Sequence, residues 1–212
     1  MAVDLDLEHV APPAKKKDYR IGAIGAGFIM RDCHLVAYGH AGYSVVAITS
    51  LPPEQAREVA ALRGIPKVYD SSEELLADPA IEVVDIAVPP NCQLAIVREA
   101  VKHAGHIKGI LAQKPLATDY QEAKEVVRRC EEAGIKLGVN QNMRYDQSVR
   151  ALKTILKRGY LGELVLATIE MRAIPHWQPW VKDLHRVTLL NMSIHHLDCF
   201  RFLFGDPESV FV

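Results

Sequence analysis

The residues with the plainest chemical meaning are two glycines near the start of the chain, Gly25 and Gly27. They lie between an apolar run at 19–25 and an amphipathic segment that opens with Phe28 and Ile29. The first glycine permits a tight turn that a Cβ atom would obstruct, and the second lets the backbone come close to a phosphate group. The free N–H groups of the following helix would bind that phosphate. We therefore predict a pyrophosphate-binding turn, and with it a dinucleotide site.

The position that would contact the ribose carries no charge. In dinucleotide-binding folds an acidic residue about 20 residues after the glycines binds the ribose 2′-hydroxyl. Here the second apolar run, 43–50, ends in Ser50, whose hydroxyl is compatible with NAD and with NADP. The nearest arginine, Arg57, lies about two helical turns further on. The third position of the glycine fingerprint is Met30, so we expect looser packing of the helix on the sheet there.

Six short apolar runs alternate with amphipathic segments, and these elements must position the chemical groups. Strands are predicted at 19–25, 43–50, 67–69, 81–88, 108–112 and 135–139. Helices are predicted at 28–39, 53–62 and 91–103, with a short one at the capping-box pair Ser71 and Glu74. Thr118 and Gln121 are expected to cap a further helix with Tyr120, Ala123, Val127 and Cys130 on one face. This alternation predicts an α/β fold with a doubly wound parallel sheet and right-handed crossovers.

The pattern changes after about residue 142. Asp146 is predicted to cap a helix that Gly159 ends. A long strand at 163–173, a helix at 190–204 and the beginning of a strand at 209–212 are expected to follow.

The predicted strand at 163–173 and the partial strand at 209–212 are too few to form a sheet that covers these helices, because small partial sheets are rarely stable alone. We expect a disordered tail (1–17), an N-terminal Rossmann domain (18–142) and part of a C-terminal α/β open-sheet domain (143–212), which makes the chain a truncated form of a two-domain protein. A small self-sufficient appendage is the alternative.

Composition narrows the class of protein. The chain has 212 residues, 49% of them hydrophobic, and a formal net charge of −1, which gives no support for a nucleic-acid or anionic-membrane partner. No apolar run approaches the ~18 residues of a membrane helix, and the acidic segment 1–10 lacks a hydrophobic signal core. The four cysteines have no paired spacing, so neither a disulfide framework nor a zinc site is expected. We expect a cytoplasmic protein.

A series of short motifs resembles the Gfo/Idh/MocA family, which includes glucose–fructose oxidoreductase and inositol dehydrogenase. Between about residues 20 and 207 the motifs are Gly25-Ala26-Gly27 with His34 downstream, Ala87-Val88-Pro89-Pro90, Gln113-Lys114-Pro115-Leu116-Ala117, Asn142-Met143-Arg144-Tyr145, Gly159-Tyr160-Leu161-Gly162-Glu163, Ile194-His195-His196-Leu197-Asp198 and Gly205-Asp206-Pro207. The resemblance implies a Rossmann domain, a C-terminal domain with a large open sheet, and oxidation or reduction of a sugar or cyclitol carbon with NAD or NADP. Complete family members are longer than this chain.

Lys114 is the first candidate catalytic residue. It follows the strand at 108–112 at its carboxyl end, where ligands bind in open α/β sheets, and Pro115 restricts it to an extended backbone. The resemblance implies that this lysine contacts the nicotinamide ribose and the reacting hydroxyl, whose proton it can relay. The alternative is that Lys114 is a solvated lysine before a turn proline and has no functional role. The resemblance places at the cofactor, besides the glycine turn, Phe28, Ile29, Ser50, Val88, Pro89, Gln113, Lys114 and Pro115.

Gln113 departs from the family pattern, because the resemblance implies glutamate before the lysine. A neutral amide would hold the ammonium charge less strongly than a carboxylate. We therefore put forward the hypothesis that the pKa of Lys114 is lower here than it would be beside glutamate.

His195 and Asn191 are the second candidate catalytic pair. The resemblance implies a histidine general base within Asp-x-x-x-His, and this chain has Asn191 at the first position. The i,i+4 spacing puts both on one helix face, where asparagine can orient the imidazole but cannot carry a proton. Either His195 works without a carboxylate, or Lys114 performs the acid–base step, or the chemistry has been lost. A zinc site from His195, His196 and Asp198 is not expected, because adjacent side chains diverge by ~100° on a helix.

The segment 175–180 holds both tryptophans of the chain. His176, Trp177 and Trp180 are candidate substrate contacts, because the apolar faces of sugar rings stack on aromatic rings. An aromatic plug over the sheet or an oligomer interface explains the segment equally well. Arg144 is a further candidate for substrate contact, with a structural salt bridge as its alternative.

The leading functional hypothesis is an NAD(P)-dependent oxidoreductase that moves a hydride between nicotinamide and a secondary alcohol of a sugar or polyol. An NAD-dependent glycosidase that oxidises its substrate transiently is the second hypothesis, and a noncatalytic NAD(P)-binding protein is the third. The open sheet would form homo-oligomers in a complete form, and there is little ground to expect association of this chain alone.

Overall fold

The computed structural model describes residues 6–172, 181–182 and 185–211. The chain divides into two compact units. The first, here called the sheet unit, is Ala14–Asn140. The second, the helical unit, combines Met1–Pro13 with Gln141–Val212.

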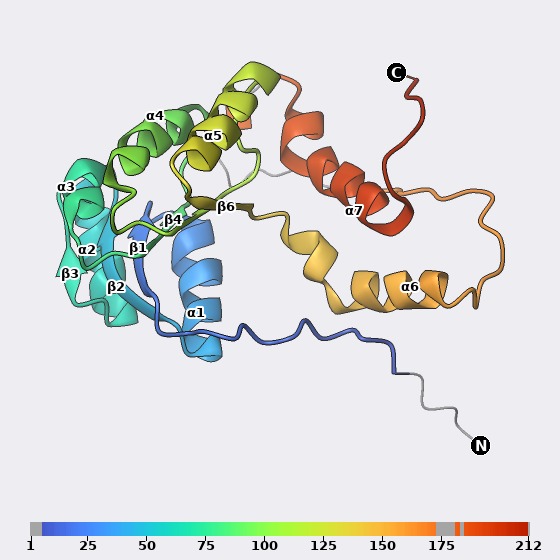
Figure 1. Ribbon diagram of the computed structural model, residues 1–212, viewed down its shortest axis with the longest axis horizontal. Coiled ribbons are helices and arrows are strands. Elements are labelled where there is room, and N and C mark those ends of the chain that lie inside the picture. The colour runs from blue at the N-terminus through green and yellow to red at the C-terminus, as the bar shows by residue number, and fades with distance from the viewer. Residues whose placement is uncertain (1–5, 173–180, 183–184, 212) are drawn as a thin grey trace. The chain divides into compact units, whose positions relative to one another are not determined.

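The sheet unit is built on one six-stranded sheet (Figure 1). Its strands are β1 (Arg20–Ile24), β2 (Ser44–Thr49), β3 (Lys67–Val68), β4 (Val83–Ile86), β5 (Gly109–Ala112) and β6 (Lys136–Val139). They pair in parallel in the order β3-β2-β1-β4-β5-β6. The strand order reverses beside β1, as in a doubly wound dinucleotide-binding sheet, so the predicted fold class is confirmed.

Helices cover both faces of this sheet. They are η1 (Ile29–His34, π-helical), α1 (Leu35–Ala41), α2 (Pro53–Arg63), α3 (Ser72–Ala77), α4 (Pro90–Ala100), the 3₁₀ turn η2 (Val101–His103) and α5 (Tyr120–Glu132). On one face Met30 and Val59, from η1 and α2, are buried with Ile48 of β2. On the other, Leu75 and Val97, from α3 and α4, belong to a second buried cluster. Figure 1 shows α4 and α5 side by side, and the two helices contact each other.

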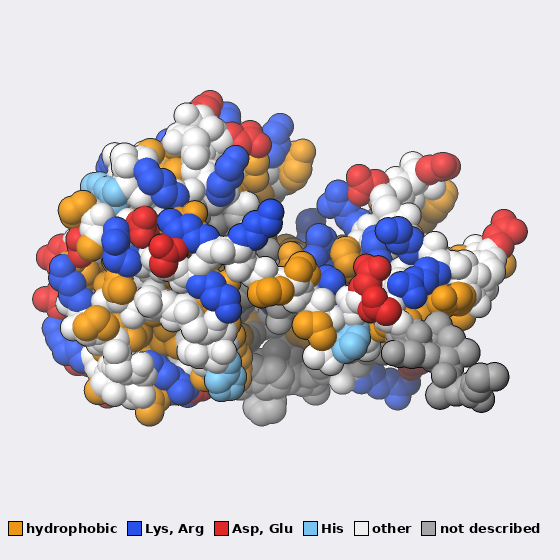
Figure 2. Space-filling view, turned by 60° about the horizontal axis from the view of Figure 1, so that its bottom comes forward, with side chains coloured by type: hydrophobic (Ala, Val, Ile, Leu, Met, Phe, Trp, Pro, Cys, Tyr) orange, Lys and Arg blue, Asp and Glu red, His pale blue; other side chains and the backbone are white. Residues whose placement is uncertain are grey.

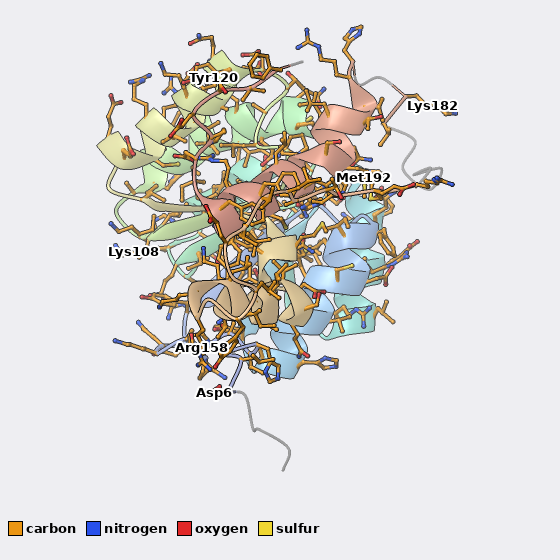
Figure 3. The ribbon with its side chains drawn as sticks, turned by 90° about the vertical axis from the view of Figure 1, so that its right-hand side faces the viewer. Asp6, Lys108, Tyr120, Arg158, Lys182 and Met192 are labelled. Carbon is orange, nitrogen blue, oxygen red and sulfur yellow. The ribbon has the colours of Figure 1, made fainter. Side chains whose placement is uncertain are left out.

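Helix α5 begins differently from the prediction. Its N-cap is Asp119, whose carboxylate accepts hydrogen bonds from the backbone N–H groups of Gln121 (2.8 Å) and Glu122 (3.0 Å). Tyr120 is 72% exposed at the start of the helix (Figure 3). Val126, and not the predicted Val127, is buried with Cys130. The predicted cap was therefore wrong, because the carboxylate of Asp119 satisfies two free N–H groups of the first turn. The predicted face was wrong at Tyr120 and Val127, whereas Cys130 is buried as predicted.

The cap of α3 confirms part of the predicted capping box. Ser71 accepts a hydrogen bond from the N–H group of Glu74. The return bond differs, because the Glu74 carboxylate accepts from the N–H group of Asp70 instead of that of Ser71.

The described part of the helical unit contains helices and loops. The helices are the 3₁₀ turn η3 (Asn142–Tyr145), α6 (Gln147–Lys157), the π-helical η5 (Thr188–Ser193) and α7 (Ile194–Phe204). Asp146 caps α6 by accepting from the N–H group of Ser148 at 2.8 Å, and Gly159 follows it with φ +71°, so both helix signals are confirmed. No helix among the described residues is long and apolar enough to cross a membrane.

The strands predicted in this unit are wrong over the described residues. Residues 163–172 and 209–211 form no strand, and the side chains of Val165 and Leu166 are 95% and 81% exposed. The β-branched and apolar composition of 163–172 favours a strand, but a strand needs a hydrogen-bonding neighbour. The described residues of the helical unit provide no such neighbour.

The cap of α5 gives a direct test. Asp119→Ala should lower the free energy of unfolding by about 1 kcal/mol, because two backbone N–H groups lose their acceptor. Thr118→Ala is the matched control, since the Thr118 hydroxyl donates to the side chain of Glu122 at 3.1 Å, whereas Asp119 accepts from two backbone N–H groups. Urea denaturation of both variants measures the difference, and equal losses would contradict the assignment of the cap.

Candidate active site

The loops that carry the predicted cofactor residues leave the sheet at one edge. Each is joined to its neighbour by a backbone hydrogen bond just beyond the strands. These bonds run from Gly25 N–H to Thr49 O (2.8 Å), from Ala87 N–H to Ile24 O (2.8 Å), from Gln113 N–H to Ile86 O (2.9 Å) and from Asn140 N–H to Ala112 O (2.8 Å). The glycine turn and the lysine loop therefore share the carboxyl edge of the sheet, where open α/β folds bind ligands.

The glycine turn has the geometry that a pyrophosphate requires. Gly25 has φ +103°, and a Cβ atom on it would lie 2.4 Å from the carbonyl oxygen of Ala87. Only glycine fits at that position. Gly27 is exposed, with open space where a Cβ atom would stand, so its backbone can be approached closely. The first helical hydrogen bond follows, from Arg31 N–H to the Gly27 carbonyl oxygen at 2.8 Å.

A hollow of ≈ 300 Å³ borders this turn between η1 and α2. Its lining includes Gly27, Phe28 and Arg31. Phe28 is about half exposed, and Ile29 beside it is half-buried. Phe28 thus borders the hollow, and Ile29 is the first residue of η1.

At the predicted ribose position the structure shows a buried, uncharged residue, and the arginine next along the sequence is paired. Ser50 is buried at the end of β2. Arg57, the nearest arginine in the sequence, forms ion pairs with Glu54 (3.1 Å) and Asp70 (2.5 Å). On the face drawn in Figure 2, acidic and basic side chains are intermixed.

The backbone around Lys114 is fixed by two amide side chains. Gln93 of α4 is fully buried, and its Nε2 donates to the carbonyl oxygens of Gln113 (2.8 Å) and Pro115 (2.9 Å). The Gln113 side-chain oxygen accepts from the N–H group of Lys114 at 2.8 Å. The loop on both sides of Lys114 is thereby tied to α4. The sequence analysis missed Gln93, although a glutamine beside Leu94 on an apolar helix face was a visible signal.

Burial lowers the pKa of the Lys114 ammonium. Desolvation penalises the charged form, so the neutral amine, which can accept a proton, becomes more accessible at a given pH. This direction agrees with the hypothesis of a lowered pKa, but its cause is burial. The effect of Gln113 in place of glutamate stays a prediction.

A second polar group lies buried beside the lysine loop. The Nδ1 atom of His34 lies 2.8 Å from Oδ2 of Asp85, and the Tyr38 hydroxyl donates to the same oxygen at 2.7 Å. The Nε2 atom of His34 lies 3.3 Å from Nε2 of Gln113 and 2.7 Å from Nδ2 of Asn140. Burial, followed by the charge of Asp85, raises the pKa of Tyr38, so its hydroxyl stays protonated. The sequence analysis gave His34 no role, and the signal was a carboxylate within the apolar strand β4.

The helical unit holds the other candidates. Asn191 in η5 and His195 in α7 are both buried. Met192, the residue after Asn191 in η5, is labelled in Figure 3. Arg144 forms a bidentate ion pair with Asp198 of α7, which includes an Nε–Oδ2 bond of 2.8 Å. The salt-bridge alternative for Arg144 is thus present, and its contact with substrate stays a prediction.

The predicted substrate contacts His176, Trp177 and Trp180 lie outside the described residues. Across the residues that are described, no three His, Cys, Asp or Glu side chains are grouped so that they could hold a metal ion.

The buried Gln93 generates a prediction. Gln93→Leu keeps the size of the side chain but leaves the carbonyl groups of Gln113 and Pro115 without their donor, which should cost about 2 kcal/mol of unfolding free energy. The control is Gln121→Leu, which changes an exposed glutamine at the start of α5 and should cost less than about 0.5 kcal/mol. Thermal and urea denaturation measure both variants. Equal stability of the two would show that Gln93 does not hold the loop.

Comparison with known proteins accords with this geometry. Residues 19–141 match the family model described as the oxidoreductase family with an NAD-binding Rossmann fold, and residues 149–212 match the GFO/IDH/MocA C-terminal domain. The chain is 31% identical to a D-apiose dehydrogenase of Rhizobium rhizogenes over 80% of its length and 49% of that protein. It is 30% identical to a 1,5-anhydro-D-fructose reductase of Ensifer adhaerens over 90% of its length and 58% of that protein. The chain thus spans about half the length of these curated relatives.

A solved oxidoreductase structure is also similar to this chain. An oxidoreductase from Agrobacterium radiobacter, in complex with NAD⁺, L-tartaric acid and magnesium, is 28% identical with a TM-score of 0.79. The similarity covers 89% of this chain and 55% of that one. With its Rossmann sheet, its glycine turn and both matching family models, the chain belongs to the Gfo/Idh/MocA oxidoreductase family.

Proposed function

We propose that the protein is an NAD(P)-dependent dehydrogenase or reductase that acts on a secondary alcohol of a sugar or polyol. The observation that carries the proposal is that Lys114 lies on the same sheet edge as the glycine turn, in a loop held by the buried amide of Gln93. The names of the two curated relatives, a D-apiose dehydrogenase and a 1,5-anhydro-D-fructose reductase, support a carbohydrate substrate.

The glycine turn, Ser50 and the loop residues Val88, Pro89, Gln113 and Pro115 would hold the dinucleotide. When bound, the nicotinamide accepts a hydride from the alcohol carbon or donates one to the carbonyl carbon. The chain's own task is to align the reacting groups and to move the hydroxyl proton.

Lys114 is the residue that we assign to this proton. During alcohol oxidation its neutral amine takes the proton from the hydroxyl, and in the reverse direction its ammonium returns that proton. Burial favours the neutral amine, and the fixed loop backbone restricts where the side chain starts. His195 is proposed as a second acid–base group, with Asn191 as the residue that orients it.

We also propose four substrate contacts, because aromatic rings stack on the apolar faces of sugars and an arginine can bond a polar group through two N–H groups. They are Arg144, His176, Trp177 and Trp180. We place the protein in the cytoplasm, which suits its four free cysteines. A homo-oligomer is proposed for a full-length form.

Two measurements test the function. Calorimetric titration with NAD and with NADP should show binding of at least one dinucleotide, and a screen of sugars and polyols should show a change in reduced-nicotinamide absorbance. Cofactor binding without net turnover, but with release of an aglycone from a glycoside, would instead identify a glycosidase. Failure to bind either dinucleotide would refute the proposal.

The two glycines should separate folding from binding. Gly25→Ala should destabilise the fold by about 2 kcal/mol or more, because its Cβ atom would collide with the Ala87 carbonyl group at a positive φ. Gly27→Ala should fold like the wild type, because the space beside it is open, and yet bind the dinucleotide at least about tenfold more weakly. Denaturation and calorimetry measure the two effects. Unchanged affinity in Gly27→Ala would place the pyrophosphate elsewhere.

If Lys114 transfers the proton, the rates of oxidation and reduction should depend on pH in opposite directions. Oxidation needs the neutral amine, so its rate should rise with pH to a midpoint below the ordinary lysine pKa of about 10.4. Reduction needs the ammonium, so its rate should fall over the same range. Lys114→Met should lower kcat/KM by about 100-fold or more in both directions and remove this pH dependence. An unchanged profile in the variant would exclude Lys114 as the titrating group.

The lowered pKa of Lys114, which favours the proposed proton transfer, also lowers the stability of the fold at pH values where lysine is charged. A lysine whose folded-state pKa is lowered destabilises the fold at pH values below that pKa, and the loss disappears as the pH rises toward the unfolded-state value. Lys114→Met should therefore raise the free energy of unfolding at pH 7, by an amount that shrinks at higher pH. Denaturation at a series of pH values checks the sign.

A further inference from the structure

We propose that His34 is a positioning residue that acts on Lys114 through the side-chain amide of Gln113, and that Asp85 holds His34 as its neutral Nδ1–H tautomer. The inference rests on the proposed role of Lys114 in proton transfer. It assigns a function to a buried polar chain that the proposed reaction does not otherwise use.

The orientation of the Gln113 amide is fixed by a backbone group. The Lys114 N–H group can only donate, and it lies 2.8 Å from one end of the amide, which must therefore be the oxygen. The NH₂ end of Gln113 then points toward the imidazole ring of His34, at 3.3 Å from Nε2. A backbone donor thus decides the orientation of this amide.

The proton position on His34 follows. Because the Gln113 NH₂ group is a donor, the ring nitrogen that faces it must accept and carries no proton. Nδ2 of Asn140, after β6, approaches the same nitrogen at 2.7 Å. The ring proton therefore lies on Nδ1, which donates to Oδ2 of Asp85 at 2.8 Å.

Asp85 anchors this chain of bonds in the sheet. It is fully buried in the middle of β4, where its neighbours Val84 and Ile86 are also fully buried. The Tyr38 hydroxyl from α1 donates to the same carboxylate oxygen that His34 binds. A buried carboxylate with two donors is a fixed acceptor, because its release would leave a charge without partners. Strand β4 is thus connected through His34 and Gln113 to the backbone of Lys114.

The amide at position 113 keeps this chain free of a second charge. A glutamate there would present acceptor oxygens both to the Lys114 N–H group and to Nε2 of His34. The ring would then need protons on both nitrogens and would become an imidazolium between two carboxylates. In the described structure the His34 ring is bonded to Asp85, which also accepts from Tyr38, and its other nitrogen faces the neutral amides of Gln113 and Asn140.

Nitrogen-15 NMR of the histidine side chains in the full chain tests the tautomer without any need for activity. The His34 signals, assigned by their absence in His34→Gln, should show a protonated Nδ1 and an unprotonated Nε2 at neutral pH. In Gln113→Glu both nitrogens should be protonated. An Nε2–H tautomer or an imidazolium in the wild type would overturn the proposal.

The link to Lys114 is tested by its titration. Carbon-13 NMR of reductively methylated lysines should show a changed Lys114 midpoint in His34→Leu and little change in His34→Gln, whose amide can still donate on one side and accept on the other. In the activity assay His34→Leu should lower kcat roughly 10- to 100-fold, as expected of a displaced catalytic group, with a much smaller change in the dinucleotide KM. His40→Leu, an exposed histidine of α1, is the matched control and should change neither quantity.

The outcomes separate the two proposals. If the wild type lacks dehydrogenase activity, the proposed function is refuted. The tautomer of His34 and the titration of Lys114 then still test the proposed role of His34. A folded His34→Leu variant with an unchanged Lys114 midpoint would overturn the inference alone. If His34→Leu does not fold, Gln113→Leu takes its place with the same readouts, because it removes the link and keeps the His34–Asp85 pair.

Discussion

The structure depends first on the backbone ladder that crosses the parallel sheet and continues beyond the strand ends. Gly25 and Gln113, each the first residue after a strand, donate their N–H groups to Thr49 and Ile86 on neighbouring strands. Buried backbone donors need acceptors, so the residues that leave the sheet are held in register before any side chain acts. The same pairing that orders the strands therefore places the glycine turn and the lysine loop at one edge.

Buried polar side chains carry this order from the sheet into the loops. Asp85 and Gln93 are fully buried in apolar layers, and each bonds to a segment distant in the sequence. Each of these side chains is held by the bonds of one end only, because in the described structure Asp85 Oδ1 and Gln93 Oε1 are buried without a hydrogen-bond partner. A buried polar side chain favours the arrangement of the chain in which its polar atoms are bonded. The apolar clusters supply the driving force for folding, while these two residues define where the loop around Lys114 lies.

Local patterns explain what the sequence could predict. The glycine turn, the apolar strands and the cap at Asp146 depend on neighbouring residues, and the structure contains all of them. The pairing of His34 with Asp85 joins residues 51 positions apart, so it becomes visible only when the strand order is known. The strand expected at 163–173 failed over its described residues for a related reason. A β-propensity is local, but a strand exists only with a neighbour, and no sequence window contains that information.

Two amides stand where the family pattern has carboxylates, Gln113 before the lysine and Asn191 one helical turn before His195. A carboxylate stabilises the protonated form of its neighbour by charge, whereas an amide orients the neighbour without favouring either form. At Lys114 the structure adds burial, which disfavours the charged form further. We expect the amide at position 113 to act in the same direction, toward a neutral amine that accepts a proton. For the proposed reaction we therefore expect Lys114 to take a proton from an alcohol more readily than a solvated lysine beside a carboxylate would.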